Sequence, residues 1–308
     1  MSKNIPLFSD IPAQIKLVEV GPRDGLQNEN VSLSVATRIE FIEKLADCGL
    51  RYIEAGSFVY SKKIPQLIES AQVITQLRPQ PNVVYAALVP NLHGLEDAIA
   101  AGVREVSFFT TVSETFCQKN INCSIAESLE RLAMLAPLAQ KNHIKIRAYI
   151  SCVLGCPYEG KIPFEKTAKL AEILTNAGCY EVSLGDTIGV GTPHEAYTLI
   201  QETARRIPLQ QIAVHFHNTY GQALANILVA LQLGVHVIDS SVAGLGGCPY
   251  AKGASGNVST EDVVYMLHGL GLKTGVDLAK LSHVGHWISD KLKHKTRSNV
   301  GETYTQHT

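Results

Sequence analysis

Short apolar runs rich in β-branched residues alternate along the chain with longer stretches in which apolar residues recur every three or four positions. The first pattern is typical of buried strands, and the second of helices that pack one face against a core. Eight strands are predicted, at residues 15–20, 52–55, 83–89, 105–109, 144–150, 180–184, 212–216 and 235–240. Helices are predicted between them, at residues 36–48, 66–77, 92–101, 125–142, 164–177, 194–207 and 221–233.

This repeat of a strand followed by a helix predicts parallel strands joined by right-handed crossovers. Eight such units close a (β/α)8 barrel. A doubly wound open sheet is the alternative, but no Gly-x-Gly-x-x-Gly follows the first strand, which weakens its dinucleotide-binding form. We therefore expect an α/β fold with one TIM-barrel domain over residues 1–308. The barrel would span about 14–270, and the extension 271–308 would hold an extra helix at 278–293 and a loose polar tail from Thr296.

Composition narrows the classes of function. The chain has 308 residues, of which 45% are hydrophobic, and 27 basic residues against 28 acidic ones give a net charge of −1. This balance excludes a general nucleic-acid or membrane-surface binder, because such a protein needs a basic face. No apolar stretch approaches the roughly 18 residues that span a bilayer. A small anionic ligand is still compatible, because its site needs only a few local cations.

The seven cysteines are odd in number and scattered, so they do not form a disulfide framework. We interpret them as mostly buried thiols of a reduced protein. Residues 1–12 lack the apolar segment of a secretory leader and the Arg/Ser bias of a transit peptide. These features predict a cytoplasmic location.

Polar residues gather at the predicted carboxyl ends of the strands, which form the functional end of a barrel. If the barrel closes, strands six, seven, eight, one and two form one continuous arc around its mouth. The candidates on this arc are Arg23, Asp24 and Gln27 after the first strand, Glu54 at the end of the second, Asp186 at the end of the sixth, and His215 and His217 on the seventh.

His215 and His217 lie two positions apart on a strand, so their rings point to the same face. Val214 and Phe216 then face the helices. Asp24 supplies a charged oxygen, and together with an amide oxygen this N/O donor set favours Mg²⁺ or Mn²⁺, with Zn²⁺ as an alternative. The competing interpretation is a pair of hydrogen-bonded core histidines and an aspartate in a Pro-Gly turn.

The loop 243–257 contains five glycines in fifteen residues, which is typical of a lid or of a close approach to a ligand. It carries Cys248, a candidate proton donor or nucleophile. Arg23 is suited to hold a carboxylate or an enolate oxygen. A cation at this mouth could support cleavage of a carbon–carbon bond next to a carbonyl, or hydrolysis by a bound hydroxide, and spacing does not choose between them. A second Gly-Cys-Pro-Tyr at 155–158 is interpreted as structural, and so is its Cys156.

Six segments together resemble the hydroxymethylglutaryl-CoA lyase family, among the metal-dependent lyase and aldolase barrels. They are VEVGPRDGLQNE (18–29), NINCSIAES (120–128), SCVLGCPYEGKI (151–162), YEVSLGDTIGVGTP (180–193), HFHNTYGQALAN (215–226) and SSVAGLGGCPYAKGASGN (240–257). Several long matches in order are specific, and the Gly-Gly-Cys-Pro-Tyr loop narrows the resemblance to the CoA lyases. It covers roughly residues 14–290.

The resemblance implies an activity and a set of roles. Such enzymes split 3-hydroxy-3-methylglutaryl-CoA into acetyl-CoA and acetoacetate, in leucine degradation and ketone-body formation, and form homodimers or small homo-oligomers. It implies a divalent cation, Mg²⁺ or Mn²⁺, on Asp24, His215, His217 and Asn257. It implies enolate stabilisation by Arg23, proton transfer by Cys248 and His215, and catalytic roles for Asp24, Glu54 and Asp186. Substrate binding is assigned to Arg23, Gln27 and Lys62. Because they follow strand ends, Lys62, Lys63, Lys119 and Lys252 are the candidates for binding the CoA phosphates.

Three positions depart from the family pattern. Asn218 stands where an aspartate is expected after the second metal histidine, residues 57–66 lack the usual Pro and Trp, and the cysteine near the C-terminus of animal members is missing. The alternatives are a related lyase or aldolase acting on another 3-hydroxyacyl-CoA or on a 4-hydroxy-2-oxo acid, a Claisen-type synthase, a metallohydrolase and a non-enzymatic barrel. The last two are disfavoured, because metallohydrolase barrels commonly carry His-x-His on the first strand and a non-enzymatic barrel would have lost a ligand.

Overall fold

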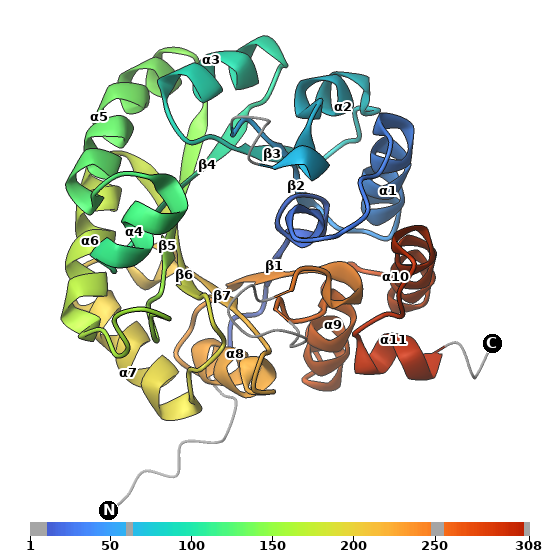
Figure 1. Cartoon of the computed structure of the whole chain (residues 1–308). Helices are drawn as coiled ribbons and strands as arrows, with labels where there is room; N and C mark the ends of the chain where they lie inside the picture. Colours follow the sequence, from blue (N-terminus) through green and yellow to red (C-terminus); the bar gives the residue numbers. More distant parts are fainter. Residues whose placement is uncertain (1–10, 60–63, 248–255, 305–308) are drawn as a thin grey trace, which may run out of the picture.

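The computed structural model describes residues 11–59, 64–247 and 256–304, and its eight parallel strands close into a barrel in sequence order (Figure 1). The strands are β1 (Lys16–Glu19), β2 (Tyr52–Ser57), β3 (Val84–Leu88), β4 (Glu105–Thr111), β5 (Lys145–Ser151), β6 (Cys179–Asp186), β7 (Ile212–Phe216) and β8 (Val237–Ser240). Closure comes from pairing of β8 with β1, where Lys16 lies opposite Val237. The predicted barrel and all eight predicted strands are therefore confirmed.

The helices surround the barrel and bury their apolar faces against the strands. They are α1 (Val35–Asp47), α2 (Ser70–Gln76), α3 (Leu92–Ala100), α4 (Glu114–Ile121), α5 (Ile125–Lys141), α6 (Phe164–Asn176), α7 (Pro193–Ala204), α8 (Ala223–Gln232), α9 (Thr260–Gly269), α10 (Leu278–Leu292) and α11 (Asn299–Tyr304). Several begin at a serine or asparagine whose side chain accepts a hydrogen bond from the first turn, as Ser34 does for α1 and Asn91 for α3.

The segment predicted as one helix over 66–77 is instead a 3₁₀ turn, Pro65–Leu67, followed by the short helix α2. The break occurs at Glu69, whose φ of 66° is incompatible with a continuous helix. Helices α4 and α9 were not predicted. Helix α9 follows β8 and completes the eighth unit, so two helices, α10 and α11, extend beyond the barrel.

The expected loose tail from Thr296 is wrong for residues 299–304, which form α11. Asp262, near the start of α9, accepts hydrogen bonds from Ser298 Oγ at 2.8 Å and from the Val300 amide at 2.9 Å. The buried carboxylate of Asp262 therefore fixes the beginning of α11. The polar sequence of the tail does not reveal this contact between α9 and α11. Within the described residues, none of the helices has the length and apolar character needed to cross a membrane.

The barrel wall separates two differently composed layers. Val214 and Phe216 belong to the apolar layer between strands and helices, as predicted, whereas Ala213 and Val237 face the barrel interior. That interior also holds charged side chains, including Arg147, which is completely buried. Below, the upper end means the carboxyl ends of the strands and the lower end means their amino ends.

Behind the upper end, buried carboxyl groups support the connection from β8 to α9. Glu261 is fully buried and accepts hydrogen bonds from the Ala243 amide at 3.0 and 2.9 Å. Ala243 has a φ of 57°, a strained conformation for a residue with a side chain. A Cβ atom on Gly285 of α10 would lie 2.3 Å from Glu261 Oε1, so only glycine fits there. Burial raises the pKa of Glu261 to about 8 and that of Glu19 to about 7.

Candidate active site

The residues after β1 form one π-helical turn, Gly21–Gly25, which presents Arg23 and Asp24 at the upper end. A Cβ atom on Gly21 would lie 2.6 Å from Glu19 Oε1, and one on Gly25 would lie 2.8 Å from Leu245 Cβ. The two glycines therefore let the turn pack against the segment after β8. Single π-turns are frequent at functional sites because they reposition side chains.

Arg23 is buried and lies between two carboxylates. Its Nε donates to Glu54 Oε2 at 2.8 Å, its Nη2 lies 2.6 Å from the same oxygen, and its Nη1 donates to Asp24 Oδ1 at 2.6 Å. Burial opposes its charge, but Glu54 and Asp24 outweigh this and raise the pKa of Arg23. Glu54 also accepts a hydrogen bond from Ser107 of β4. The guanidinium is therefore held in a fixed position at the barrel mouth.

Asp24, His215 and His217 bring their ligand atoms within 4.8 Å of one another. The Nε2 atoms of the two histidines lie 3.3 Å apart, and His215 Nε2 lies 4.0 Å from Asp24 Oδ2. Both rings are buried, and they share one face, as their spacing predicted: His215 belongs to β7 and His217 directly follows its last residue. Closure of the barrel brings the turn after β1 against them.

The charges in this cluster are set by burial and by neighbours. Burial disfavours ionisation of Asp24, but Arg23 and the two histidines outweigh it and lower the pKa of Asp24 to about 2. Burial and His215 lower the pKa of His217 to about 4, against the opposing effect of Asp24. At neutral pH the cluster therefore consists of a carboxylate beside an uncharged imidazole, the forms in which these groups bind a metal ion.

The donor set fits a divalent cation. His215 Nδ1 lies 3.3 Å from a carboxylate oxygen of Asp239, which accepts hydrogen bonds, so in the neutral imidazole Nδ1 would carry the proton and Nε2 the lone pair. That lone pair faces His217 Nε2 and Asp24, and a cation between these atoms would satisfy all three. Carboxylate and imidazole without thiolate match Mg²⁺ and Mn²⁺ and accommodate Zn²⁺.

Asn257 reaches the same cluster from the other side. It forms an isolated antiparallel bridge with His217, and its amide nitrogen donates to Asp24 Oδ2 at 2.8 Å and to the Leu245 carbonyl at 3.1 Å. The residue is buried. The structure thus brings together all four residues that the family resemblance implies as metal ligands.

The other predicted site residues have different surroundings. Gln27 is half-buried, and its Oε1 is buried without a hydrogen-bond partner among the described residues. Asp186 accepts hydrogen bonds from the Val190 and Gly191 amides and thereby shapes the turn after β6. Burial raises the pKa of Asp186 to about 6. It is not among the residues that meet at Asp24.

Several other sequence predictions concern residues around this mouth. Cys248 and Lys62, with Lys63 and Lys252, lie outside the described residues, as does most of the glycine-rich loop. Lys119 Nζ lies 4.0 Å from the centroid of the Tyr158 ring, a cation–π contact. The unusual Asn218 accepts a hydrogen bond from the amide of Ala223, the first residue of α8, at 3.2 Å.

The first Gly-Cys-Pro-Tyr segment has a structural explanation. Cys156 is buried, and its sulfur lies 2.9 Å from Ser113 Oγ and accepts from the Tyr158 and Glu159 amides at 3.4 Å each. These contacts close a tight turn in which Cys156 pairs with Gly160. The contacts of Cys156 within the described residues are thus those of a turn.

Sequence reasoning missed a set of interior residues below the histidines. Asp239 of β8 contacts His215, and it is bound in turn by Arg147 of β5 and Ser183 of β6. Tyr149 of β5 packs the edge of its ring at 80° to His215, with 5.8 Å between the ring centroids. A signal was available, because polar residues alternate with apolar ones along these strands, whereas only strand ends had been searched.

The similarity to known proteins extends over the whole barrel. The family model described as HMGL-like matches residues 14–288.

The chain belongs to the HMGL-like family.

Named relatives of this HMGL-like chain match over nearly its whole length. It is 53% identical to the mitochondrial hydroxymethylglutaryl-CoA lyase of Macaca fascicularis over 292 residues, which cover 95% of this chain and 90% of the relative. It is 52% identical to the cytoplasmic 3-hydroxy-3-methylglutaryl-CoA lyase of Rattus norvegicus over 295 residues, which cover 96% and 86%. The crystal structure of hydroxymethylglutaryl-CoA lyase from Pseudomonas aeruginosa superimposes with a TM-score of 0.95 at 50% identity, covering 97% of this chain and all of that one.

Proposed function

We propose that this protein is a hydroxymethylglutaryl-CoA lyase that cleaves (S)-3-hydroxy-3-methylglutaryl-CoA to acetyl-CoA and acetoacetate. The relatives that match it over nearly the full chain carry this name. One structural observation carries the proposal: a partly buried carboxylate and two buried imidazoles converge next to the fixed guanidinium of Arg23 at the barrel mouth. Such a site can stabilise negative charge on oxygen atoms of a bound substrate.

We assign Asp24, His215, His217 and Asn257 as the residues that would hold a divalent cation, with Mg²⁺ or Mn²⁺ preferred. The side-chain amide of Asn257 would have to turn over for this, because its nitrogen now faces Asp24. When bound, such a cation polarises substrate oxygens and stabilises the charge that develops on them. Arg23 is placed to act beside it. Because Glu54 and Asp24 hold its guanidinium, Arg23 can donate to the thioester oxygen without reorganising during the reaction.

The reaction requires two proton movements. The tertiary hydroxyl loses its proton and becomes the ketone of acetoacetate as the bond between C2 and C3 breaks. The released electron pair forms the enolate of acetyl-CoA, and C2 then takes up a proton to become the acetyl methyl group. We assign this second proton to Cys248 on the glycine-rich loop and keep His215 as the candidate for the first.

His215 could contribute to proton transfer through one atom. Its Nδ1 is engaged by Asp239, so Nε2 is the nitrogen that faces Asp24 and His217. Ligation of a cation and removal of the hydroxyl proton would therefore compete for the same lone pair. Substitution of His215 is expected to affect metal binding and turnover together, whereas substitution of Cys248 is expected to separate them.

The remaining assignments are proposals as well. Gln27 is proposed to contact substrate because its buried Oε1 has no hydrogen-bond partner among the described residues. Lys62 is proposed as a further substrate contact from the family resemblance. Asp186 is proposed to act through the turn after β6, whose amides it binds, rather than on the substrate itself.

The decisive experiment measures both products. Purified full-length protein is incubated with hydroxymethylglutaryl-CoA and Mg²⁺ or Mn²⁺, and acetoacetate and acetyl-CoA are measured with and without a chelator. We expect equal amounts of both products and their loss with chelator. A parallel series with other 3-hydroxyacyl-CoA thioesters and with 4-hydroxy-2-oxo acids tests the related lyase and aldolase activities. Absence of acetoacetate in all metal conditions would contradict the proposal.

Location and assembly are also proposals. We propose a cytoplasmic protein that forms a homodimer or small homo-oligomer. Relatives named cytoplasmic and mitochondrial match this chain about equally well, at 52% and 53% identity. Fractionation of the source cells and light scattering of the purified protein would measure these two properties directly.

A further inference from the structure

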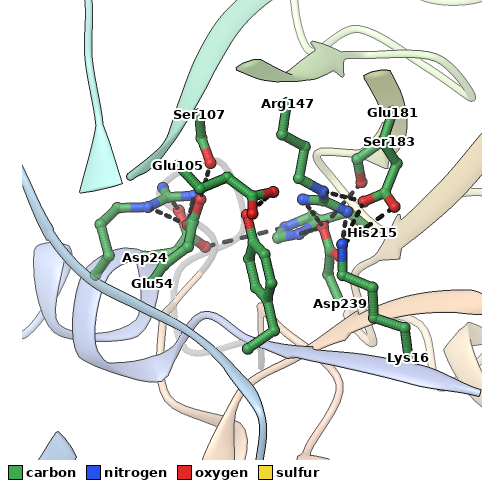
Figure 2. A network of polar contacts seen from close by, with 12 residues as sticks. Lys16, Asp24, Glu54, Glu105, Ser107, Arg147, Glu181, Ser183, His215 and Asp239 are labelled. Atoms are coloured by element: carbon green, nitrogen blue, oxygen red, sulfur yellow. Dashed lines mark hydrogen bonds and ion pairs between the residues drawn. The ribbon is translucent and has the colours of Figure 1, made fainter. Parts of the chain in front are cut away.

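Asp239 lies directly beneath the candidate metal site, inside the barrel. It belongs to β8 and is almost completely buried. Its Oδ2 lies 3.3 Å from His215 Nδ1, on the side of the imidazole opposite Asp24 and His217. Figure 2 shows it between His215 and Arg147. No argument from the sequence singled out this residue.

The position of Asp239 is fixed by side chains from β5 and β6, which reach it through the barrel interior. Arg147 of β5 donates to both carboxylate oxygens, from Nη2 to Oδ1 at 2.7 Å and from Nη1 to Oδ2 at 3.1 Å. Ser183 of β6 donates to Oδ2 at 2.8 Å. A carboxylate held by a bidentate arginine and a hydroxyl has little rotational freedom, so it presents Oδ2 to His215 in one geometry.

We propose that Asp239 is a positioning residue that selects the His215 tautomer and orientation required for metal binding. This inference rests on the metal site of the proposed function. An acceptor at Nδ1 requires the proton there and leaves the Nε2 lone pair directed at Asp24 and His217. Without Asp239, the ring is free to place its proton on Nε2, and the cluster loses one ligand.

The chain provides a matched control in Glu181. This residue of β6 accepts a hydrogen bond from Arg147 Nε at 2.5 Å, so it binds the same guanidinium as Asp239 does. The other partner of Glu181 is Lys16, whose Nζ lies 3.2 Å from Glu181 Oε2. Lys16 is the first residue of β1, so this contact lies toward the lower end of the barrel. Asp239→Asn and Glu181→Gln each remove one carboxylate charge from Arg147. The described contacts connect Asp239, and not Glu181, to His215.

The experiment titrates metal-free protein with Mn²⁺ and follows the electron paramagnetic resonance signal of the free ion. For Asp239→Asn we expect affinity to fall on the order of 10- to 100-fold, the usual effect of removing the partner of a ligating histidine. For Glu181→Gln we expect affinity close to wild type. Thermal unfolding of both variants provides the comparison of stability. Equal losses of affinity in the two variants, or an unchanged Asp239→Asn, would overturn the positioning role.

A second measurement needs no substitution at Asp239 and so covers the case in which that variant does not fold. The ¹⁵N spectrum of histidine-labelled, metal-free wild type reports which ring nitrogen carries the proton, and the signals missing in His215→Gln assign His215. We expect a protonated Nδ1 and a bare Nε2, and the reverse tautomer would overturn the inference. Neither measurement uses substrate. Wild type that binds Mn²⁺ but does not cleave hydroxymethylglutaryl-CoA would refute the proposed function alone.

Discussion

The two ends of the barrel interior are both buried and charged, yet they are organised in opposite ways. At the lower end each donor meets an acceptor: Lys16 Nζ donates to Tyr180 OH at 3.0 Å, and Glu105 accepts from Tyr52 at 2.9 Å and from Tyr180. At the upper end, the ligand atoms of Asp24, His215 and His217 converge instead, with 3.3 Å between the Nε2 atoms of the two imidazoles. Buried charge therefore does not mark the site, whereas a convergence of groups that can ligate a metal ion does.

The difference has an energetic meaning. Buried polar groups that pair with one another stabilise the fold, or at least avoid the cost of burial without a partner. At the upper end the clustered groups also have partners in the protein, such as Arg23 and Asn257 for Asp24, but we propose that a divalent cation binds where they converge. We therefore expect substitutions at the upper end to change binding and turnover, and those at the lower end to change stability.

The broadest effect is expected from His217→Ala, because it should change both metal affinity and turnover. Removing one of the clustered acceptors should lower Mn²⁺ affinity by about 100-fold or more, beyond the range for residues that only support a ligand. Turnover should fall with it, while the thermal midpoint changes little. Titration of metal-free protein with Mn²⁺ measures the affinity. An unchanged titration would show that His217 is not a ligand, and the contrast between the two ends would be lost.

Cys248→Ala should lower turnover without changing metal affinity, and so separate these two properties of the upper end. We expect turnover with hydroxymethylglutaryl-CoA to fall about 100- to 10,000-fold, the usual contribution of a positioned proton donor. Mn²⁺ affinity should stay at the wild-type value, because a thiol does not belong to the proposed ligand set. Steady-state kinetics at saturating metal and a Mn²⁺ titration measure the two quantities. Near-normal turnover would remove Cys248 from the mechanism.

At the lower end, Glu105→Ala should have the reverse outcome. It leaves the hydroxyls of Tyr52 and Tyr180 without their shared acceptor, at a cost of about 1–3 kcal/mol in the free energy of unfolding. Turnover per folded molecule should remain unchanged. Denaturant unfolding and kinetics on the same preparation provide the test. A loss of turnover without a loss of stability would mean that the lower end takes part in catalysis.

A gradual effect of pH on stability is expected from the carboxyl groups behind the upper end. The pKa of Glu261, ordinarily near 4.5, is raised to about 8 in the folded protein by burial. The folded state therefore keeps a proton that the unfolded chain releases, so stability present below about pH 4.5 is progressively lost as the pH rises through 8. Glu19, with a pKa of about 7, acts in the same direction.

Glu261→Gln tests this dependence, because glutamine keeps the acceptor for the Ala243 amide but does not titrate. We expect the decline in thermal midpoint between pH 5 and pH 8.5 to become shallower in the variant. The matched comparison is Asp262→Asn, at a neighbouring position where the carboxylate binds α11 instead. An equally steep decline in Glu261→Gln and in wild type would contradict the assignment.

The sequence predicted those features of the site that depend on a single strand or a single turn. The alternation around His215 and His217 specified their shared face, and the Gly-Pro-Arg-Asp-Gly segment placed Asp24 at a strand end. Contacts across the barrel were not predictable in this way. The partner of Arg147 depends on which strands closure brings opposite β5, and that is fixed only in three dimensions.

The sequence also gave no sign of two local conformations that depend on tertiary contacts. Nothing in the residues 66–77 indicates that Glu69 adopts a positive φ and interrupts the helix, and the polar residues after Thr296 gave no sign of the contacts that order α11. In both cases tertiary packing overrides the local preference of the chain. Inspection of alternate positions along whole strands, rather than strand ends, would have found Arg147, Glu181 and Asp239.

The contact between Gly285 and Glu261 has a consequence for how this chain can vary. A methyl group at position 285 would lie 2.3 Å from Glu261 Oε1, so position 285 can accept a side chain only if the Glu261 carboxylate moves or is shortened. A genetic selection that starts from a defective Gly285→Ala strain should recover suppressors at position 261 with shorter side chains. An evolving sequence that gains a side chain at position 285 must therefore either pass through a poorly folded intermediate or first acquire a shorter residue at position 261.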